Sequence, residues 1–280
     1  MEPLTFMNVG LIAGQGRMPL LVARGIRETG SRLVCGGLHG QYDLQPRTLC
    51  DEFTDVGLVR IGQWMRVLRK ARVTQAVMVG GVAKQRMHDR WRLIRQIPDW
   101  RAAMLWYRHL RHDRRNATVL RAVAEELHRN GITLIDSTTY IPDQLASEGV
   151  MTRAHPSTGV RGDIDFGWPL LKQMVELDVG QSIAVRDRDV IAVEAVEGTD
   201  AMISRAGELC PSRGWTLLKT AKRDHDMRAD VPTIGLSTIQ RAAEAGCTCI
   251  AVGAGRVILV DKPAVLKAAD EKKIVIVGVA

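Results

Sequence analysis

The first half of the chain repeats one pattern, in which a short apolar run is followed by a glycine turn and an amphipathic helix. Val9 to Ala13 leads through glycines into a helix predicted over 20–28, and Gln75 to Val79 ends in a double glycine. A further helix is predicted over 117–129. Strands that alternate with helices favour a parallel sheet covered by helices. The sequence therefore predicts a Rossmann-like α/β domain over residues 1–136.

The second half carries a different mixture of elements. A helix is predicted to end near Leu177, and the strong alternation over 182–196 predicts a β-hairpin that turns at Arg186 to Asp189. Other strands are predicted over 215–221, 249–252, 257–260 and 274–277, with helices over 238–245 and 264–269. These elements predict a mixed α/β domain over residues 137–280, and thus a chain of two α/β domains.

Composition indicates a globular protein of a reducing compartment. Of its 280 residues, 46% are hydrophobic and 25% are charged, which is typical of a folded soluble domain. No apolar run approaches the roughly 20 residues that cross a bilayer. Glu2 precedes strand-like sequence, so we expect no signal peptide and a cytoplasmic location. Five scattered cysteines fit reduced thiols better than a disulfide framework, and Cys247 and Cys249 are expected to share one face of a strand.

The net charge of +8 indicates an anionic partner, and much of the excess lies in one segment. Residues 84–115 contain nine Arg and one Lys against three acids, with Trp91, Trp100 and Trp106 among them. Arg and Trp on an amphipathic helix are typical of a segment that lies in a membrane interface. The alternative is a solvated helix whose tryptophans pack on the core. No recognisable nucleic-acid module is present, so nucleic acid is not an expected partner.

Two turns dense in carboxylates lie between apolar runs of the second half. They are Glu197-Gly198-Thr199-Asp200 and the segment from Asp226 to Pro232. Crowded carboxylates repel one another, and a fold tolerates them when a metal ion or a basic side chain lies among them. Lys219, Lys222 and Arg228 are near in sequence and suit phosphate oxygens. The pattern favours a phosphate or metal-assisted site, although each acid taken singly also fits a helix cap or a surface turn.

Glycine turns in the first half offer a second place for phosphate. Gly14 and Gly16 stand between a predicted strand and a helix, where unpaired backbone N–H groups attract anions. Pro19 stands where the dinucleotide-binding fingerprint has its third glycine, so that motif is absent. Gly80-Gly81 ends another strand and precedes Lys84, so we expect the two turns to be neighbours in one cleft. Tight packing alone also explains both turns.

Longer strings of residues make the chain resemble a known enzyme family over nearly its whole length. They are Gly10-Leu-Ile-Ala-Gly14, Leu177-Asp-Val-Gly-Gln181, Val193-Glu-Ala-Val-Glu-Gly-Thr-Asp-Ala-Met202, Asp226-Met-Arg228 with Asp230-Val-Pro-Thr-Ile-Gly235, and Ala245-Gly-Cys-Thr-Cys-Ile-Ala-Val252. In this order they are similar to the UDP-2,3-diacylglucosamine pyrophosphatases of lipid A biosynthesis, of the LpxI type. The chain differs from the usual family pattern at Arg223, His225 and Ala229.

The resemblance implies a reaction, a cofactor and a location. The family has two domains with a lipid substrate held between them. With Mg²⁺ it hydrolyses the pyrophosphate of UDP-2,3-diacylglucosamine to UMP and 2,3-diacylglucosamine 1-phosphate (lipid X). A lipid substrate gives the Arg/Trp segment a purpose, because a cytoplasmic enzyme must then reach the anionic inner leaflet as a peripheral protein. Whether the chain forms a homo-oligomer stays open.

The residues and the resemblance together give a predicted site. The family's catalytic acid corresponds by motif to Asp226, which we assign to metal or water activation. Asp200 and Glu197 are the predicted supporting acids, with Asp200 as a second metal ligand. Arg228 is counted with the catalytic residues as a phosphate contact, and Lys219 is a second phosphate contact. The predicted substrate-binding residues are Lys219 with Gly14, Gly16, Lys84, Thr199 and Asp230.

Two other classes of protein stay open from the sequence. One is a nucleotide-sugar or dinucleotide enzyme that uses the glycine turn and binds a soluble nucleotide without acyl chains. The other is a non-catalytic protein that binds a lipid or a nucleotide sugar. A binder of anionic phosphate gains nothing from nearby carboxylates unless a metal is present, so the acids favour an enzyme.

Overall fold

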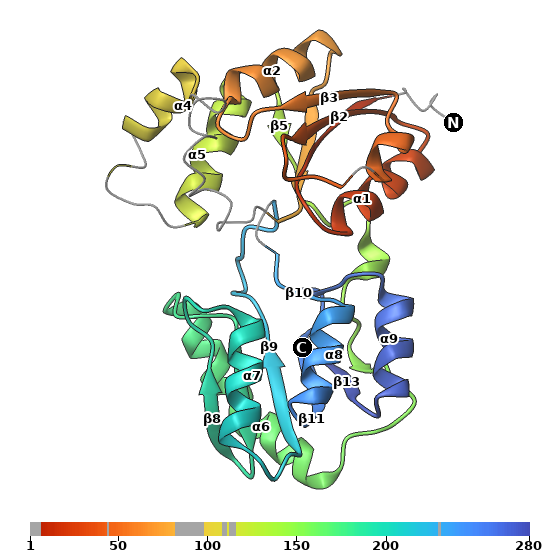
Figure 1. Ribbon diagram of the computed structural model, residues 1–280, viewed down its shortest axis with the longest axis vertical. Coiled ribbons are helices and arrows are strands. Elements are labelled where there is room, and N and C mark those ends of the chain that lie inside the picture. Colours follow the sequence, from red (N-terminus) through yellow and green to blue (C-terminus); the bar gives the residue numbers. More distant parts are fainter. Residues whose placement is uncertain (1–6, 44, 82–97, 108–110, 112–115, 229–230) are drawn as a thin grey trace. The chain divides into compact units, whose positions relative to one another are not determined.

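The computed structural model describes residues 7–43, 45–81, 98–107, 111, 116–228 and 231–280. Contacts divide the chain into two compact units (Figure 1). Unit 1 comprises Met1–Ile141 and Asp226–Asp230, and unit 2 comprises Pro142–His225 and Val231–Ala280. The predicted domains of 1–136 and 137–280 differ from this division mainly because the short segment that contains Asp226 is counted with unit 1.

Unit 1 is built on a five-stranded parallel sheet in the order β3-β2-β1-β4-β5. Its strands are β1 (Asn8–Ala13), β2 (Arg32–Leu38), β3 (Glu52–Val56), β4 (Gln75–Val79) and β5 (Thr133–Leu134). The chain moves from β1 to β3 in one direction and then crosses to the other side of β1, which is the strand reversal of Rossmann-like folds. The predicted Rossmann-like parallel sheet is confirmed.

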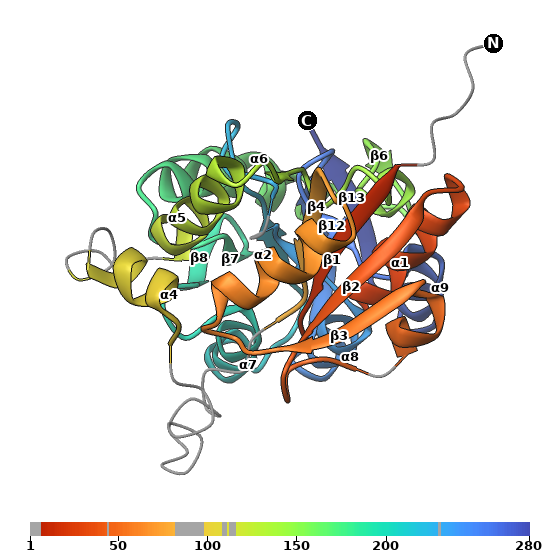
Figure 2. The same ribbon diagram turned by 90° about the horizontal axis from the view of Figure 1, so that it is seen from above.

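Helices cover both faces of this sheet (Figures 1 and 2). They are α1 (Met18–Glu28), α2 (Ile61–Lys70), α4 (Trp100–Leu105) and α5 (Asn116–Arg129), with a 3-10 turn η1 (Gln45–Leu49). α1 contacts β1 and β2, while α2 and α5 bury their apolar side chains on the opposite face. In α2 the buried Ile61, Trp64, Met65 and Leu68 recur at helical spacing, so the helix turns one apolar stripe to the sheet.

Unit 2 holds a mixed six-stranded sheet in the order β6-β13-β11-β9-β7-β8. Its strands are β6 (Gly149–Val150), β7 (Ser182–Arg186), β8 (Asp189–Val193), β9 (Trp215–Lys219), β11 (Cys247–Gly253) and β13 (Val275–Val279). β9, β11 and β13 run parallel, while β6, β7 and β8 pair antiparallel with their neighbours. A separate parallel pair joins β10 (Thr233–Ile234) to β12 (Ile258–Leu259). The predicted hairpin and the predicted mixed second domain are confirmed.

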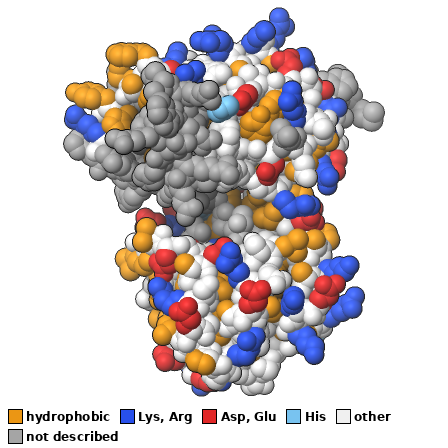
Figure 3. Space-filling model, in the orientation of Figure 1, with side chains coloured by type: hydrophobic (Ala, Val, Ile, Leu, Met, Phe, Trp, Pro, Cys, Tyr) orange, Lys and Arg blue, Asp and Glu red, His pale blue; other side chains and the backbone are white. Residues whose placement is uncertain are grey.

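The helices of unit 2 also lie on both faces of its sheet. They are α6 (Thr158–Glu176), α7 (Thr199–Leu209), α8 (Leu236–Glu244) and α9 (Lys262–Glu271), with a 3-10 turn η4 (Pro142–Gln144). One core lies between α6 and the sheet, and a second lies beneath α7, α8 and α9. Figure 3 shows acidic and basic side chains mixed over these three helices. No helix in the described part of the chain is long and apolar enough to cross a membrane.

A β-bulge separates Cys247 from Cys249 in β11. The two residues pair with the adjacent residues Trp215 and Thr216 of β9, so Thr248 is the extra residue of the bulge. Cys247 then packs in the core beneath α7, α8 and α9, and Cys249 packs in the core against α6. The expectation that both cysteines share one face is therefore wrong. Burial raises the pKa of the Cys247 thiol to about 12, which keeps it protonated and unreactive.

The cysteines of unit 1 also differ from expectation. Cys35 of β2 and Cys50, which follows η1, form a disulfide, whereas Cys210, Cys247 and Cys249 are free and buried. The expectation of reduced thiols throughout is wrong for this pair. The crosslink closes the loop from β2 to β3, which contains Asp43.

Close backbone packing leaves no room for a side chain at Gly25, a helical glycine of unit 1. A Cβ on Gly25 of α1 would lie 1.9 Å from the carbonyl oxygen of Tyr140. We expect Gly25→Ala to lower the free energy of unfolding by about 1–3 kcal/mol through overpacking. Gly159→Ala in α6 is the matched control, because its Cβ would meet only Ser157 Oγ at 3.9 Å. Urea unfolding should leave that control unchanged or slightly stabilised, and equal losses in both variants would contradict the packing argument.

Candidate functional site

The glycine turns after β1 and β4 are joined by their backbones. Gly14 N donates to the carbonyl of Val79 at 2.8 Å, and Gln15 and Gly81 exchange two hydrogen bonds of 2.9 Å. A Cβ on Gly14 would lie 2.7 Å from the carbonyl oxygen of Gly81, and one on Gly80 would lie 2.7 Å from the carbonyl carbon of Gly14, so both turns need glycine for this approach. The predicted neighbourhood of the two turns is confirmed, and it lies at the strand reversal of the parallel sheet.

The N–H groups of Gly14 and Gly16 already have acceptors. Gly14 N donates to the carbonyl of Val79, and Gly16 N donates to the Asp43 carboxylate at 2.9 Å. Asp43 was missed in the sequence, and it lies in the loop that the Cys35–Cys50 disulfide closes. A phosphate at Gly16 would have to displace this carboxylate, so the assignment of Gly14 and Gly16 to substrate binding stays a prediction.

Asp226 and Arg228 lie on a short loop that is anchored to unit 1. The carbonyl of Met227 accepts hydrogen bonds from Ser137 N at 3.1 Å and from Ser137 Oγ at 2.8 Å. Ser137 is buried and follows β5, so the loop lies at the carboxyl edge of the parallel sheet. The turn that presents Ser137 is shaped by Asp136, whose Oδ1 accepts from Thr138 N at 2.7 Å and from Thr138 Oγ1 at 2.8 Å.

The side chains of Asp226 and Arg228 form a two-pronged ion pair. Arg228 Nε donates to Asp226 Oδ1 at 2.7 Å, and Arg228 Nη2 donates to Oδ2 at 2.5 Å. These hydrogen bonds raise the pKa of the Arg228 guanidinium further above its ordinary value. The side chains are 48% and 38% exposed, so the pair is open to a ligand. A guanidinium fixed in this way presents its remaining N–H groups in a geometry that suits phosphate.

A second cluster of predicted residues is buried in unit 2. Lys219 ends β9 and donates to Thr199 Oγ1 at 2.6 Å, while Thr199 Oγ1 donates to Glu194 Oε1 at 2.9 Å. The other oxygen of Glu194 accepts from Ser182 Oγ and lies 3.9 Å from Lys219 Nζ. Lys219 and Glu194 are only 5% and 11% exposed. Their attraction therefore offsets part of the free energy that is lost when both charges leave water.

The structure brings two predicted substrate-binding residues, Lys219 and Thr199, into direct contact. It also adds Glu194 and Ser182, which the predicted site did not include. Ser182 pairs directly with Lys219 across the antiparallel strands β7 and β9. That cross-strand position is the signal that could have found it.

Glu197 and Asp200 lie on the surface beside this cluster and are paired with arginines. Glu197 Oε1 lies 2.9 Å from Arg205, and Asp200 Oδ2 lies 3.2 Å from Arg241. The backbone N–H of Glu197 itself, followed by Arg205, lowers the pKa of the Glu197 carboxyl, which keeps it ionised near neutral pH. Asp200 is in the first turn of α7, where a carboxylate also complements the helix dipole. Their assignment as supporting acids stays a prediction.

Comparison with known proteins identifies the family. The family model described as the LpxI N-terminal domain matches residues 8–144, and the one described as the LpxI C-terminal domain matches residues 147–277. The chain belongs to the LpxI family. This membership confirms the resemblance seen in the sequence motifs, the two-domain α/β fold and the prediction that the chain is an enzyme.

A curated relative matches over almost the full length of this LpxI chain. The UDP-2,3-diacylglucosamine pyrophosphatase LpxI of Caulobacter vibrioides is 29% identical over 287 residues, covering 97% of this chain and 97% of the relative. A solved biotin carboxylase domain of Hydrogenobacter thermophilus 2-oxoglutarate carboxylase covers 73% of this chain and 41% of that chain. It is 11% identical with a TM-score of 0.26, which is too low to inform the fold.

The donor set of this LpxI chain decides how a metal could be held. Within the described residues, no group of three or more His, Cys, Asp or Glu side chains is arranged to hold an ion. The predicted ligands Asp226 and Asp200 belong to different units. Mg²⁺ usually binds through one or two carboxylates, retained waters and substrate phosphates, so the exposed Asp226 carboxylate suits that mode without a protein cage. The predicted Mg²⁺ site stays a prediction.

Several predicted positions lie outside the described residues. Lys84, Asp230 and Ala229 are among them, as is most of the Arg/Trp segment at 84–115. Of that segment the structure describes 98–107 and 111. The predictions for these positions therefore stay as the sequence made them.

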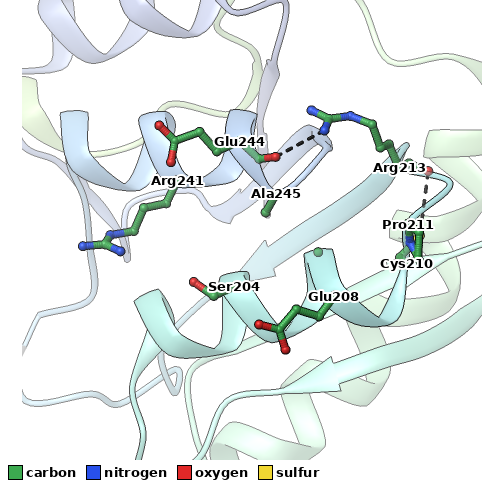
Figure 4. A pocket seen from close by; sticks show the side chains of 9 residues that line it. Ser204, Glu208, Cys210, Pro211, Arg213, Arg241, Glu244 and Ala245 are labelled. Carbon is green, nitrogen blue, oxygen red and sulfur yellow. Dashed lines mark hydrogen bonds between the residues drawn. The ribbon is translucent and has the colours of Figure 1, made fainter.

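A groove of about 430 Å³ in unit 2 lies between α7 and α8 (Figure 4). It is lined by Ser204, Gly207, Glu208, Cys210, Pro211, Arg213, Arg241, Glu244 and Ala245. Arg213 donates to the carbonyls of Ala243 at 2.7 Å and Glu244 at 3.2 Å, so its guanidinium satisfies the end of α8. None of the predicted site residues that the structure describes lines this groove, which fits a joint between two helices.

The buried cluster gives a test of its electrostatics. We expect Lys219→Met to lower the free energy of unfolding by about 3–5 kcal/mol, because Glu194 keeps a buried charge without its partner. Adding Glu194→Gln should recover part of this loss, because a neutral amide needs no counter-charge. Lys222→Met is the control, since its pair with the exposed Asp178 at 2.8 Å contributes at most about 1 kcal/mol. Additive losses in the double variant, measured in urea, would rule out the coupling.

Proposed function

We propose that this protein hydrolyses the pyrophosphate bond of UDP-2,3-diacylglucosamine to UMP and 2,3-diacylglucosamine 1-phosphate in lipid A biosynthesis. Membership of the LpxI family and the full-length similarity to a UDP-2,3-diacylglucosamine pyrophosphatase support the substrate. The observation that carries the proposal is the exposed Asp226–Arg228 pair at the carboxyl edge of a parallel sheet. That edge is where α/β folds bind ligands.

The chemistry of this reaction matches the side chains at hand. Pyrophosphate hydrolysis needs charge neutralised on the phosphoryl oxygens and a positioned water. Arg228 offers a fixed guanidinium to those oxygens, and Asp226 offers a carboxylate that can accept a proton from water. Because the two side chains share two hydrogen bonds, Asp226 also orients Arg228. Replacing either residue therefore disturbs the other.

Mg²⁺ is the metal that we propose for this reaction. When bound, the ion would neutralise charge on the phosphoryl oxygens that it contacts. Asp226 would hold it together with the substrate, and Asp200 is the second proposed ligand. Lys219 and Thr199 are proposed to meet substrate through the surface end of their buried network.

The proposed location is the cytoplasm, at the inner leaflet of the inner membrane. A substrate with two acyl chains resides in a bilayer, because each buried methylene contributes on the order of 0.8 kcal/mol. An enzyme without a membrane-crossing helix among its described residues would then act as a peripheral protein. The net charge of +8 favours an anionic leaflet.

The first test compares wild type with Asp226→Asn in hydrolysis of UDP-2,3-diacylglucosamine with Mg²⁺. We expect wild type to release UMP and lipid X, and the variant to be at least about 100-fold slower through loss of acid–base chemistry. Asp224→Asn is the matched control, because Asp224 is an exposed acid only two residues away. It should stay within about twofold of wild type.

The other outcomes of this test are equally informative. Equal activity of wild type and Asp226→Asn would support the reaction and show that Asp226 is not a catalytic residue. Wild-type protein that binds the lipid without hydrolysing it would instead favour a non-catalytic carrier. Thermal shift with UMP and lipid X in parallel separates soluble-nucleotide binding from lipid binding.

A further inference from the structure

One face of α2 carries three basic side chains in a row. Arg66, Arg69 and Lys70 are exposed, and Arg69 and Lys70 follow Arg66 by three and four positions, so both are its neighbours on the helix surface. No carboxylate among the described residues pairs with any of the three. Like charges at this spacing destabilise a helix by about 0.2–0.5 kcal/mol per pair. We call these three residues the α2 basic stripe.

Asp99 fixes α4 beside this stripe. Its Oδ1 accepts from Ala102 N at 2.9 Å and so caps α4, while its Oδ2 accepts from Gly62 N at 2.6 Å in the first turn of α2. A Cβ on Gly62 would lie 2.8 Å from Asp99 Oδ2, so glycine at this position admits the carboxylate. One acid therefore caps two helices and holds them side by side, which Figures 1 and 2 both show. Its negative charge serves two helix N-termini.

The two helices enclose a basic groove of about 650 Å³. It is lined by the α2 basic stripe with Gly62, Met65, Asp99, Trp100, Arg101 and Asn130. Arg101 is held at the groove by an ion pair of 2.6 Å with Glu126, and its side chain is still 43% exposed. Figure 3 shows basic side chains along the α2 edge of this unit and apolar side chains over α4.

Aromatic side chains near these charges are exposed to solvent. Trp100 is 77% exposed, and Trp106 and Tyr107 are 46% and 65% exposed at the end of the same short helix. Arg111 lies over the Tyr107 ring at 4.8 Å. Exposed Trp costs free energy in water, and its amphipathic ring is favoured at the level of lipid headgroups.

We propose that the groove between α2 and α4 is the surface by which this protein docks on an anionic phospholipid bilayer. The α2 basic stripe and Arg101 would face lipid phosphates, and Trp100 would enter the headgroup layer. Exposed aromatic side chains next to a basic stripe favour a bilayer over a free phosphate, which needs no apolar contact. The inference rests on the proposed function for its purpose, because a diacylated substrate lies in such a bilayer.

The test measures binding to vesicles in the absence of substrate. The full-length protein is sedimented with vesicles of phosphatidylglycerol and phosphatidylcholine, and with vesicles of phosphatidylcholine alone. We expect Arg66→Gln/Lys70→Gln/Arg69→Gln to bind the anionic vesicles on the order of 100-fold more weakly, because each basic residue near an anionic leaflet contributes about 1 kcal/mol. Trp100→Ala should also weaken binding.

The matched control removes the same charge elsewhere. Lys267→Gln/Lys272→Gln/Lys273→Gln takes three exposed lysines from the end of α9 in unit 2, and it should change vesicle binding by less than about threefold. Circular dichroism and thermal melts confirm folding of both triple variants. Equal binding by wild type and the α2 triple variant would overturn the proposal, as would equal losses in both triple variants. Stronger wild-type binding to single-stranded RNA than to the anionic vesicles would also overturn it.

This outcome is separable from the fate of the proposed function. Hydrolysis of detergent-dispersed substrate should be unchanged in the α2 triple variant and lost in Asp226→Asn. If wild type is inactive but its vesicle binding still depends on the α2 basic stripe, the proposed activity is wrong and the docking surface is supported. If wild type is fully active and the α2 triple variant binds vesicles as well as wild type does, the proposed activity stands and the docking surface is wrong.

Discussion

The hydrogen bonds from Ser137 to the carbonyl of Met227 decide which unit carries the candidate catalytic pair. The two residues are 90 positions apart in the chain, and their contact brings a loop of the second half onto the sheet of unit 1. Asp226 and Arg228 are thereby presented at the carboxyl edge of five parallel strands, the edge at which the glycine turns also meet. The turn that holds Ser137 is itself fixed by Asp136, so the geometry of the candidate pair also depends on this side chain.

Local patterns were sufficient for most elements of this fold. The helix predicted over 117–129 is α5, and the hairpin predicted around Arg186 to Asp189 is formed by β7 and β8, because periodicity and turn chemistry act over a few residues. Nothing was predicted for 52–70, where β3 and α2 form. In α2 the few apolar residues alternate with basic ones, so the helical pattern is weak in the sequence. Those apolar residues are buried because they pack on the sheet of unit 1.

The features that could not be predicted are set by contacts between distant residues. The bulge that sends Cys247 and Cys249 to opposite faces depends on their pairing with β9, which a strand pattern does not contain. The two carboxylate-rich turns looked like one acid cluster because they are close in sequence. They belong to different units, and Glu197 and Asp200 are each paired with an arginine. The motif strings predicted the family, while local charge spacing gave no information about this division.

The cations of the candidate site and those of the α2 basic stripe act over different distances. Lys219 and Arg228 are paired with Glu194 and Asp226, so each forms a nearly neutral group whose field falls off quickly. Such groups select a ligand only at contact, when phosphate oxygens compete with the carboxylates. The α2 basic stripe has no carboxylate partner among the described residues, so its field extends over the Debye length of about 8 Å. In the proposed function, attraction to an anionic surface would come from the stripe, and recognition of the reacting phosphates would come from the paired cations of the candidate site.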